Sequence, residues 1–284
     1  MKLIEESAKY SVLKSILKDM GSVLVAFSGG VDSSVLLKAS VDALGDKVMA
    51  VTADSPIRAK RDLDSARETA SQLAARHIVI KSNELSDEKV SHNASDRCYH
   101  CKKGLFLKLT ELAEKNGLEY VAEGSNVDDL AEYRPGAAAV EELGIRSPLQ
   151  EAGLTKSEIR DFSREMGLSA WYAPSESCLL TRFPYDSSIT LDDLERVEKA
   201  EDSMKSYGFR QVRVRVYKDL ARIEVSPDHV KDAADPETSA KIVKKFKELG
   251  YGHVTLDLTG YRTGSMDAAG GQWTQKRSKG YCMT

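Results

Sequence analysis

The sequence predicts an α/β fold in which a doubly wound parallel sheet is followed by a smaller α+β domain. Three observations favour it. Apolar runs alternate with helical patterns in the first third of the chain, as in sheets built from strand–helix–strand units. From about Pro184 the pattern changes to paired strands of period two flanked by helices. The length of 284 residues also suits two domains better than one.

The first strand and the helix after it are the most clearly marked elements. Val23–Phe27 is a continuous apolar run, and Ser28–Ser34 (SGGVDSS) follows it as a turn with paired glycines. Apolar residues then recur at helical spacing from Val35 to Leu44, and Gly45 is placed to end the helix. We therefore expect a strand, a glycine turn and a helix in direct succession.

Further strands and helices follow in alternation. Strands are expected at Lys47–Thr52, Ile78–Ile80 and Tyr120–Ala122. A helix is expected at Ala59–Ala75, and Leu105–Asn116 is expected to be part of another. Sheets of this kind bind ligands beyond the carboxyl ends of their strands. The turn after the first strand and the segment Glu123–Asp129 after the fourth therefore mark the candidate site.

The later part of the chain predicts the α+β domain. Its expected elements are a helix at Leu191–Tyr207, strands at Val212–Val216 and Ala221–Val225, a helix at Ser239–Leu249 and a strand at His253–Leu258. We expect domains over residues 1–183 and 184–262. Residues 263–284 are Gly-rich and aperiodic, which indicates a loosely held tail.

Composition narrows the classes of function. Lys and Arg number 41 against 44 Asp and Glu, and a net charge of −3 disfavours a nucleic-acid partner attracted by a global positive field. We find no apolar stretch long enough to span a membrane and no signal-peptide layout, so we expect a cytoplasmic protein with no membrane partner. Four cysteines are too few for a disulfide scaffold and indicate thiols, a metal or redox chemistry.

The turn Ser28–Ser34 has the chemistry of a phosphate site. Its glycines let the backbone approach a ligand while amides and hydroxyls face it; the alternative is an ordinary strand-to-helix turn capped by Ser or Asp. It lacks the Gly-Lys-Ser/Thr ending of a Walker loop. The turn resembles the PP-loop of the N-type ATP pyrophosphatases, which cleave ATP between the α- and β-phosphates and adenylylate a carboxyl or carbonyl oxygen. The resemblance implies that ATP is bound by Ser28, Gly29, Gly30, Asp32, Ser33 and Ser34, with Asp32 also catalytic.

The segment Glu123–Asp129 (EGSNVDD) resembles the second nucleotide segment of that superfamily. The resemblance places Gly124 near the nucleotide. Asp128 and Asp129 are candidate contacts for Mg²⁺ or substrate, since a hard cation that bridges phosphates prefers carboxylate oxygen, and we assign Asp129 to catalysis. The alternative is that Asn and Asp after a strand serve only as turn and N-cap residues.

Three cysteines stand out by their spacing. Cys98 and Cys101 form a CxxC motif, and Cys178 lies far along the chain. Three thiolates can hold a cubane iron–sulfur cluster with one iron left open. A redox CxxC and three unrelated core thiols are further interpretations. Structural zinc is another, and it would need a fourth ligand such as His92, His100 or Cys282.

Several segments together resemble the LarE family of ATP-dependent sulfur transferases over nearly the whole chain. They are Tyr133–Gly136, Ser175–Tyr185, Val212–Val216 and Leu256–Arg262. That family sulfurates pyridinium-3,5-dicarboxylate mononucleotide on the way to the nickel-pincer nucleotide of lactate racemase. The resemblance implies a PP-loop, HUP-like domain of the adenine nucleotide alpha hydrolase type. It also implies adenylylation of a pyridinium carboxylate, displacement of AMP by sulfur to give a thiocarboxylate, and a homo-oligomer such as a hexamer.

The resemblance assigns the sulfur chemistry to Cys178, which falls on the family's sulfur-donating cysteine. In the sacrificial form of the enzyme this residue gives up its own sulfur and becomes dehydroalanine. Cys98 and Cys101 are additional here, and members with this CxxC resemble enzymes in which three cysteines hold a [4Fe-4S] cluster that delivers an added sulfide. Cys178 is therefore interpreted first as a cluster ligand together with Cys98 and Cys101, and second as a sacrificial donor.

Charged residues of the second domain complete the candidate site. Arg182 is a candidate for binding an acidic substrate group, with a surface salt bridge as the alternative. Bidentate guanidinium groups suit phosphate. The alternative is that the charged residues of the paired strands form an ordinary solvent-exposed face of the sheet. The resemblance places Arg213 and Arg215 at positions that contact substrate phosphate, and Glu201, Glu224 and Asp232 at acidic positions near substrate or metal.

Two other functions remain as alternatives. PP-loop relatives with three cluster cysteines modify tRNA bases, but the acidic net charge and the lack of a recognisable tRNA-binding appendage argue against a tRNA-thiolating enzyme. A zinc-stabilised nucleotide-binding regulator without turnover is the other.

Overall fold

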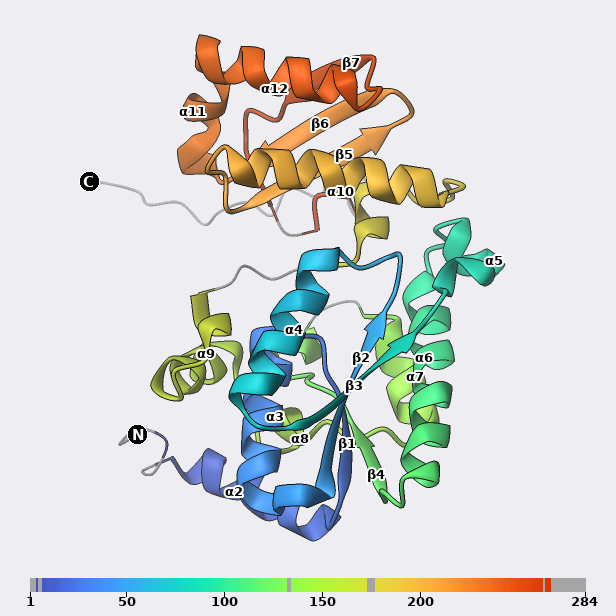
Figure 1. Cartoon of the computed structure of the whole chain (residues 1–284), viewed down its shortest axis with the longest axis vertical. Coiled ribbons are helices and arrows are strands. Elements are labelled where there is room, and N and C mark those ends of the chain that lie inside the picture. The colour runs from blue at the N-terminus through green and yellow to red at the C-terminus, as the bar shows by residue number, and fades with distance from the viewer. Residues whose placement is uncertain (1–3, 5–6, 132–133, 173–176, 263, 267–284) are drawn as a thin grey trace, which may run out of the picture. The chain divides into compact units, whose positions relative to one another are not determined.

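The structure is a computed structural model that describes residues 4, 7–131, 134–172, 177–262 and 264–266 (Figure 1). The chain divides into two compact units. The first holds the chain up to Leu180 together with Asp186–Leu194, and the second holds Thr181–Tyr185 together with the chain from Glu195 on. The sequence predicts one boundary between the two domains, after Phe183, whereas in the structure the chain passes between the units more than once.

The first unit is built on a four-stranded parallel sheet, as predicted. Its strands are β1 (Val23–Ala26), β2 (Val48–Asp54), β3 (Arg76–Lys81) and β4 (Tyr120–Ala122), in the order β3-β2-β1-β4. The chain builds outward from β1 to β3 and then returns to the other side of β1. The strand order therefore reverses between β1 and β4, which is where open α/β sheets bind ligands.

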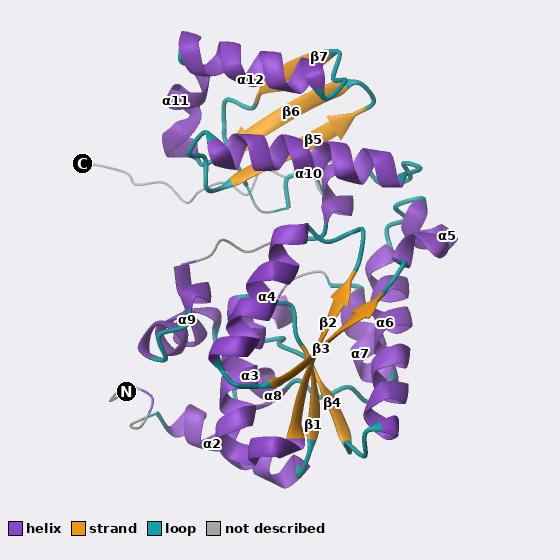
Figure 2. Cartoon of the chain, in the orientation of Figure 1, coloured by secondary structure: helices purple, strands orange, loops and turns teal. Residues whose placement is uncertain are grey.

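Helices cover both faces of this sheet (Figures 1 and 2). Residues of β1 alternate between two cores: Val23 and Val25 pack with α2, α3 and α9, whereas Leu24 packs with α6. A strand buried on both faces needs apolar residues throughout, which explains the continuous apolar sequence of β1. The described helices of this unit are α2 (Ala8–Met20), α3 (Val31–Leu44), α4 (Lys60–Gln72), α5 (Glu88–Ser91), α6 (Arg97–Lys115), α7 (Gly136–Glu142), α8 (Pro148–Glu151) and α9 (Lys156–Glu165).

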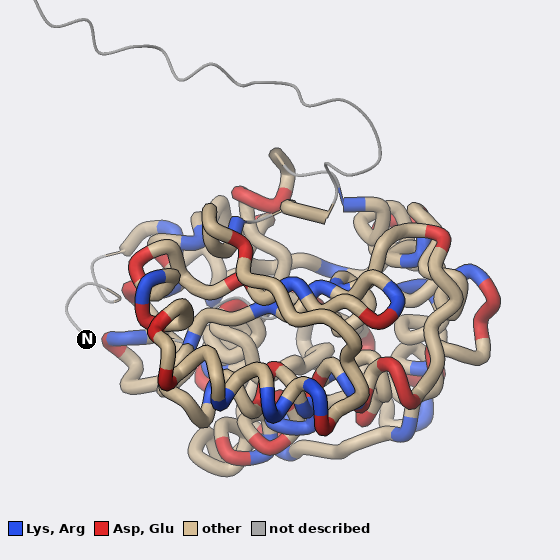
Figure 3. Tube along the Cα trace, turned by 90° about the horizontal axis from the view of Figure 1, so that it is seen from above, with Lys and Arg blue, Asp and Glu red and all other residues tan. Residues whose placement is uncertain are grey.

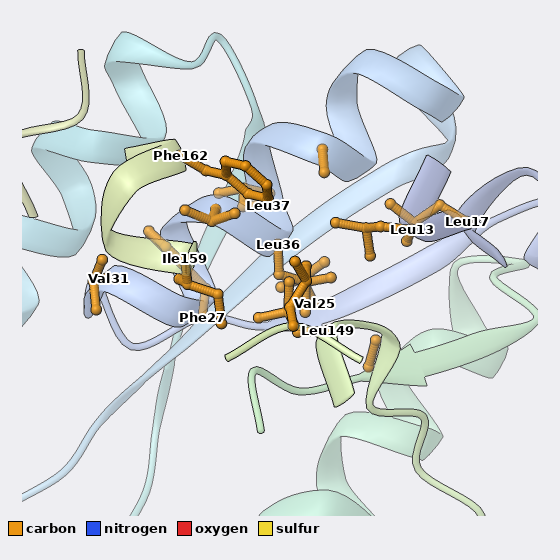
Figure 4. Packing of buried hydrophobic residues seen from close by; sticks show 14 of the residues in the cluster. Leu13, Leu17, Val25, Phe27, Val31, Leu36, Leu37, Leu149, Ile159 and Phe162 are labelled. Carbon is orange, nitrogen blue, oxygen red and sulfur yellow. The ribbon is translucent and has the colours of Figure 1, made fainter. Parts of the chain in front are cut away.

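The larger of the two cores lies against the face of the sheet that α2, α3 and α9 cover. Leu13 and Leu17 of α2, and Phe162 of α9, are buried there with Val25 of β1 and Phe27 (Figure 4). Close packing of large apolar side chains on a central strand makes this face costly to disturb. It gives the turn after β1 a rigid support.

Helix α6 contains the predicted helical segment and begins before it. The apolar pattern predicts Leu105–Asn116 as part of a helix, and α6 starts at Arg97. Its first two turns contribute little to the core, so they carry no hydrophobic periodicity for the sequence analysis to detect. As a result Cys98 and Cys101 lie on the first two turns of a 19-residue helix.

The second unit is a small α+β domain with the predicted elements. Its sheet has the order β5-β6-β7, with β5 and β6 antiparallel and β6 and β7 parallel. The register pairs Arg213 with Glu224 and Arg215 with Arg222, so these four charged residues share one face, as expected. The elements are α10 (Leu191–Ser206), most of which belongs to this unit, β5 (Val212–Tyr217), β6 (Leu220–Val225), α11 (Val230–Ala234), α12 (Pro236–Glu248) and β7 (His253–Leu256).

The first described residues of the predicted tail are held in place. Ser265 Oγ donates to both carboxylate oxygens of Glu224 (3.1 and 3.3 Å), and Met266 is buried. The expectation of a loose tail is therefore wrong for these two residues, because they cover the charged face of the β5–β6 pair. Residues 267–284, which include Cys282, lie outside the described residues.

Charges of both signs are interspersed along the described chain (Figure 3). Across the ranges that the structure describes, every helix falls short of the length and apolar character that crossing a membrane requires.

Candidate functional site

The turn after β1 is organised by its own serine hydroxyls. Ser33 Oγ donates to the carbonyl oxygen of Gly30 (3.1 Å) and lies 3.1 Å from Ser28 Oγ. The amide of Gly30 donates to Ser28 Oγ (3.4 Å). α3 begins directly afterwards, at Val31. The turn thus places amides and hydroxyls at the start of a 14-residue helix, an arrangement that suits a phosphate group.

Two glycines let backbone segments pack closely at this turn. Gly29 has a φ of +75°, and a Cβ on it would lie 3.0 Å from backbone atoms of Ala66 in α4. A Cβ on Gly124 would lie 3.0 Å from the backbone nitrogen of Ser33. The segments after β1 and β4, which the sequence analysis assigned to the nucleotide, therefore meet where the strand order reverses.

Asp32 links these two segments. It lies on the first turn of α3, and its Oδ1 accepts a hydrogen bond from Asn126 Nδ2 (3.2 Å). Its Oδ2 forms an ion pair with the ammonium group of Lys156, the first residue of α9. The carboxylate that we assigned to catalysis thus has a cation beside it that the sequence analysis did not identify.

Asp128 and Asp129 have different surroundings. Burial raises the pKa of Asp129; the amide of Asn126 (3.0 Å) and the guanidinium of Arg134 (2.7 Å) oppose this rise, and the charge of Asp32 adds to it. Asp128 instead accepts from the backbone amide of Lys156 (2.6 Å). Asp129 is therefore the carboxylate whose charge interacts with Asp32, while Asp128 fixes the start of α9.

We expect Gly29→Ala to destabilise the first unit and to weaken ATP binding by about tenfold or more. The alanine would have to adopt the left-handed φ of this position. Its Cβ would also lie only 3.0 Å from backbone atoms of Ala66. Gly117→Ala is the matched control, because Gly117 has a φ of +66° with nothing within 4 Å of the added Cβ. It should lose about 1–2 kcal/mol of stability and keep its ATP affinity. Urea unfolding and calorimetric titration with Mg–ATP measure both effects; equal ATP affinity in the two variants would contradict the placement of the nucleotide.

The three described cysteines are half-buried thiols in the first unit. Cys98 and Cys101 lie one helical turn apart on α6 and so share a face. The segment of Cys178 is fixed beside the loop after β2, where the amide of Leu179 donates to the carbonyl oxygen of Ile57 (2.8 Å). This hydrogen bond joins two segments that lie far apart in the sequence.

The Cys101 thiol interacts with both other cysteines. Burial raises the pKa of Cys101 to about 12, the negative charges of Cys178, Glu84 and Cys98 add to the rise, and Arg58 opposes it. The thiols are therefore close enough for their charges to be felt by one another. Among the residues that the structure describes, no group of three Cys, His, Asp or Glu side chains has the geometry of a metal site.

The histidines considered as zinc ligands have other partners. His100 Nε2 lies 3.2 Å from Asp96 Oδ2 on the same helix. His92 Nδ1 lies 3.0 Å from the carbonyl oxygen of Glu88. Cys282, the third candidate, is outside the described residues. Each of these histidine contacts occupies one ring nitrogen and leaves the other able to bind a metal, so zinc stays an alternative to the cluster.

A half-buried ion pair connects the cysteine helix to the segment after β4. Lys102 Nζ donates to Glu123 Oε2 (3.2 Å), and Glu123 Oε1 accepts from Ser147 Oγ (2.8 Å) and from the amide of Ser125 (3.0 Å). Burial alone would raise the pKa of Glu123, but Lys102 and these hydrogen bonds outweigh it and hold the pKa below its usual value. Gly136 packs against this pair, because a Cβ on it would lie 2.8 Å from Lys102 Cδ.

The three arginines of the second unit that we assigned to the substrate, Arg182, Arg213 and Arg215, are buried. Arg182 makes a two-pronged ion pair with Glu201 (Nε–Oε1 2.7 Å, Nη2–Oε2 3.0 Å), and neither side chain is exposed. Arg215 pairs with Glu224 (2.9 Å) and donates to Ser265 Oγ (3.0 Å). Arg213 is 1% exposed and lies over the ring of Tyr261. Their assignment to substrate phosphate and acidic groups stays a prediction. Asp232 is paired with His229 (2.9 Å) at an exposed position.

Comparison with known proteins places this geometry in a family. Residues 22–169 match the family described as the Arginosuccinate synthase N-terminal HUP domain. These residues begin just before β1 and end just after α9, so they contain both segments that we assigned to the nucleotide. The α/β unit is therefore a PP-loop domain of the HUP type.

The whole-chain relatives are more specific. A pyridinium-3,5-bisthiocarboxylic acid mononucleotide synthase of Lactiplantibacillus plantarum is 37% identical over 262 residues, which are 92% of this chain and 94% of the relative. The chain belongs to the LarE family.

Two further relatives of this LarE family member carry the name uncharacterized protein. One from Synechocystis sp. is 38% identical over 92% of this chain and 97% of its own. One from Methanocaldococcus jannaschii is 35% identical over 88% of this chain and 96% of its own. Because each alignment runs through both units, LarE membership covers the small α+β domain as well as the PP-loop domain.

Proposed function

We propose that this protein is an ATP-dependent sulfurtransferase that acts on pyridinium-3,5-dicarboxylate mononucleotide in nickel-pincer nucleotide synthesis. It adenylylates a pyridinium carboxylate, releases pyrophosphate and replaces AMP with sulfur to give a thiocarboxylate. The observation that carries the proposal is the 37% identity, over 92% of the chain, to the Lactiplantibacillus plantarum synthase. The meeting of the two nucleotide segments at the end of the sheet supports it.

The PP-loop residues serve the first half of the reaction. The amides and hydroxyls of Ser28, Gly30 and Ser33 bind the phosphates of ATP. Asp32 and Asp129 would hold Mg²⁺, which would neutralise charge on the phosphates. A carboxylate oxygen of the substrate attacks the α-phosphorus, the bond between the α-phosphorus and the bridging oxygen breaks, and pyrophosphate leaves with the electron pair.

The three thiols of the first unit serve the second half. Cys98, Cys101 and Cys178 are soft donors whose charges interact, and three thiolates are the ligands that would hold a [4Fe-4S] cluster, although the described side chains do not have the geometry of a metal site. Such a cluster would supply sulfide sulfur for the transfer. Because the pKa of Cys101 is about 12, binding must release a proton from this thiol. Arg58, which favours the thiolate, lowers the cost of that release.

Cys178 itself is the alternative sulfur source. Its thiolate would attack the adenylylated carboxyl carbon and release AMP. Loss of the Cys178 α-proton to a base and cleavage of the Cβ–Sγ bond would then leave a thiocarboxylate and dehydroalanine. This route consumes the protein after one sulfur atom, whereas the cluster route does not.

The assay uses anaerobic protein with ATP, Mg²⁺ and pyridinium-3,5-dicarboxylate mononucleotide, with and without added sulfide. We expect pyrophosphate, AMP and a thiocarboxylate, and more than one product per chain when sulfide is supplied. One product per chain, with the intact protein lighter by the mass of H₂S, would assign the sulfur to Cys178. Release of ADP and orthophosphate would overturn the proposal, and sulfuration of tRNA in its place would assign the other function.

The proposal also includes a cytoplasmic location and a homo-oligomer such as a hexamer. Both follow from the sequence expectations. Size-exclusion chromatography with light scattering measures the assembly directly.

A further inference from the structure

The PP-loop of this chain has no lysine of its own, although it is expected to face several phosphate charges. Walker loops place a lysine on the β- and γ-phosphates, and Ser28–Ser34 contains no basic residue at all. In the structure an ammonium group nevertheless reaches the loop. It belongs to Lys156, which lies 124 positions from its partner Asp32.

The position of Lys156 is fixed by the start of α9. Thr155 is the N-cap of this helix and forms a capping box with Glu158. The backbone amide of Lys156 donates to Asp128 Oδ2 (2.6 Å), which ties the first turn of α9 to the segment after β4. The side chain therefore starts from a well-defined point and extends to Asp32.

Two carboxylates face this ammonium. Asp32 is its direct partner, and the charges of both Asp32 and Lys156 act on Asp129. Two carboxylates near one another repel unless a cation lies with them. Without a divalent cation, Lys156 provides that positive charge at Asp32, and Arg134 provides it at Asp129. A divalent cation held by the carboxylates would take over this role at Asp32 and leave the Lys156 ammonium for another anion.

We propose that Lys156 is a catalytic residue for adenylylation, whose ammonium group contacts the phosphate chain of ATP and neutralises the charge of the departing pyrophosphate. This inference rests on the proposed function for the identity of the reaction. Lys156 remains protonated throughout: the substrate oxygen bonds to the α-phosphorus, the electron pair of the broken bond stays on pyrophosphate, and the ammonium donates hydrogen bonds to it. A side chain 31% exposed, at the edge of the loop, is accessible to this ligand.

Lys38 provides a matched control. Its side chain is also 31% exposed and also pairs with an aspartate, Asp42 (2.5 Å), but further along α3 from the loop. The test compares Lys156→Gln with Lys38→Gln by calorimetric titration with Mg–pyrophosphate, which needs no acyl substrate, and by the rate of pyrophosphate release.

We expect Lys156→Gln to bind pyrophosphate about tenfold more weakly and to lower kcat by about a hundredfold. Lys38→Gln should stay within about twofold of wild type in both. Wild-type affinity and kcat in Lys156→Gln would overturn the proposal. If wild type binds pyrophosphate in a Lys156-dependent way but does not act on the pyridinium carboxylate, the proposed function fails and the role of Lys156 stands.

A second measurement avoids substitution altogether. Wild-type protein is acetylated briefly with and without Mg–pyrophosphate, and the modified lysines are quantified by peptide mass spectrometry. We expect pyrophosphate to protect Lys156 several-fold and to leave Lys38 unchanged. Equal acetylation of Lys156 in the two samples would overturn the proposal even if the variants failed to fold.

Discussion

Cys178→Ala should abolish thiocarboxylate formation while pyrophosphate release persists. Both sulfur routes require this thiol, whereas the PP-loop lies after β1 and is held by contacts to the segment after β4. Removing one half-buried sulfur leaves the Leu179 to Ile57 hydrogen bond (2.8 Å) in place. The assay measures pyrophosphate and thiocarboxylate in the same reaction. Undiminished thiocarboxylate in the variant would exclude Cys178 from sulfur transfer.

Variants of the other cysteines distinguish the cluster route from the sacrificial route. If the three thiols hold one cluster, Cys98→Ala and Cys101→Ala lose thiocarboxylate formation as fully as Cys178→Ala, and all three lose bound iron and sulfide. If Cys178 is a sacrificial donor, the first two variants remain active for one turnover. Cys282→Ala, outside the CxxC and Cys178, is the control and should match wild type.

The second large effect is on stability. We expect Arg182→Met to lower the free energy of unfolding by about 3–5 kcal/mol, because it leaves the Glu201 charge buried without its closest partner. Neither side chain of this pair is exposed, and Glu201 also accepts from the amide of Val214 (3.0 Å). Chemical unfolding of both proteins measures the difference. A loss under about 1 kcal/mol would mean that the pair behaves as a surface salt bridge.

Two further variants test whether the unpaired buried charge of Glu201 causes the loss of stability in Arg182→Met. Arg182→Met/Glu201→Gln removes the buried charge but keeps an oxygen for the Val214 amide, so most of the stability should return. Lys241→Met breaks the exposed pair with Glu237, whose side chains are 60% and 80% exposed. Its effect should stay within about 0.5 kcal/mol.

The same pair predicts how stability depends on pH. Burial alone would raise the pKa of Glu201, but Arg182 and Arg213 outweigh it and hold the pKa below its unfolded value. The stabilisation is therefore complete above the unfolded pKa and is lost as the pH falls through the folded pKa. In Arg182→Met the burial effect dominates, so the stability difference between the two proteins should shrink on acidification.

Much of the fold could be predicted because it rests on local patterns. The apolar run of β1 and the period-two strands β5 and β6 are set by which faces they bury, and the structure confirms them. The start of α6 at Arg97 was missed, because its first turns bury few apolar side chains. The fixed positions of Ser265 and Met266 were missed because they depend on Glu224 and on packing against a different segment.

The candidate site was predictable where its chemistry lies in consecutive residues. Ser28–Ser34 and Glu123–Asp129 are such segments, and the structure brings them together. Lys156 and Lys102 could not be found in this way, because a single lysine in a sequence carries no signal of the carboxylate it will face. Asp32 and Glu123 could be identified because they lie within these two segments. Folding brings Lys156 to Asp32 and Lys102 to Glu123.

The most direct test of adenylylation follows an oxygen atom from the substrate carboxylate to AMP. Pyridinium-3,5-dicarboxylate mononucleotide labelled with heavy oxygen in its carboxylates is incubated with the protein, ATP and Mg²⁺, and the AMP is analysed by mass spectrometry. Adenylylation predicts one heavy oxygen in each AMP formed, because the carboxylate oxygen that attacks the α-phosphorus stays there when sulfur displaces AMP. AMP without the label, or the label in orthophosphate alongside ADP, would contradict the proposed reaction.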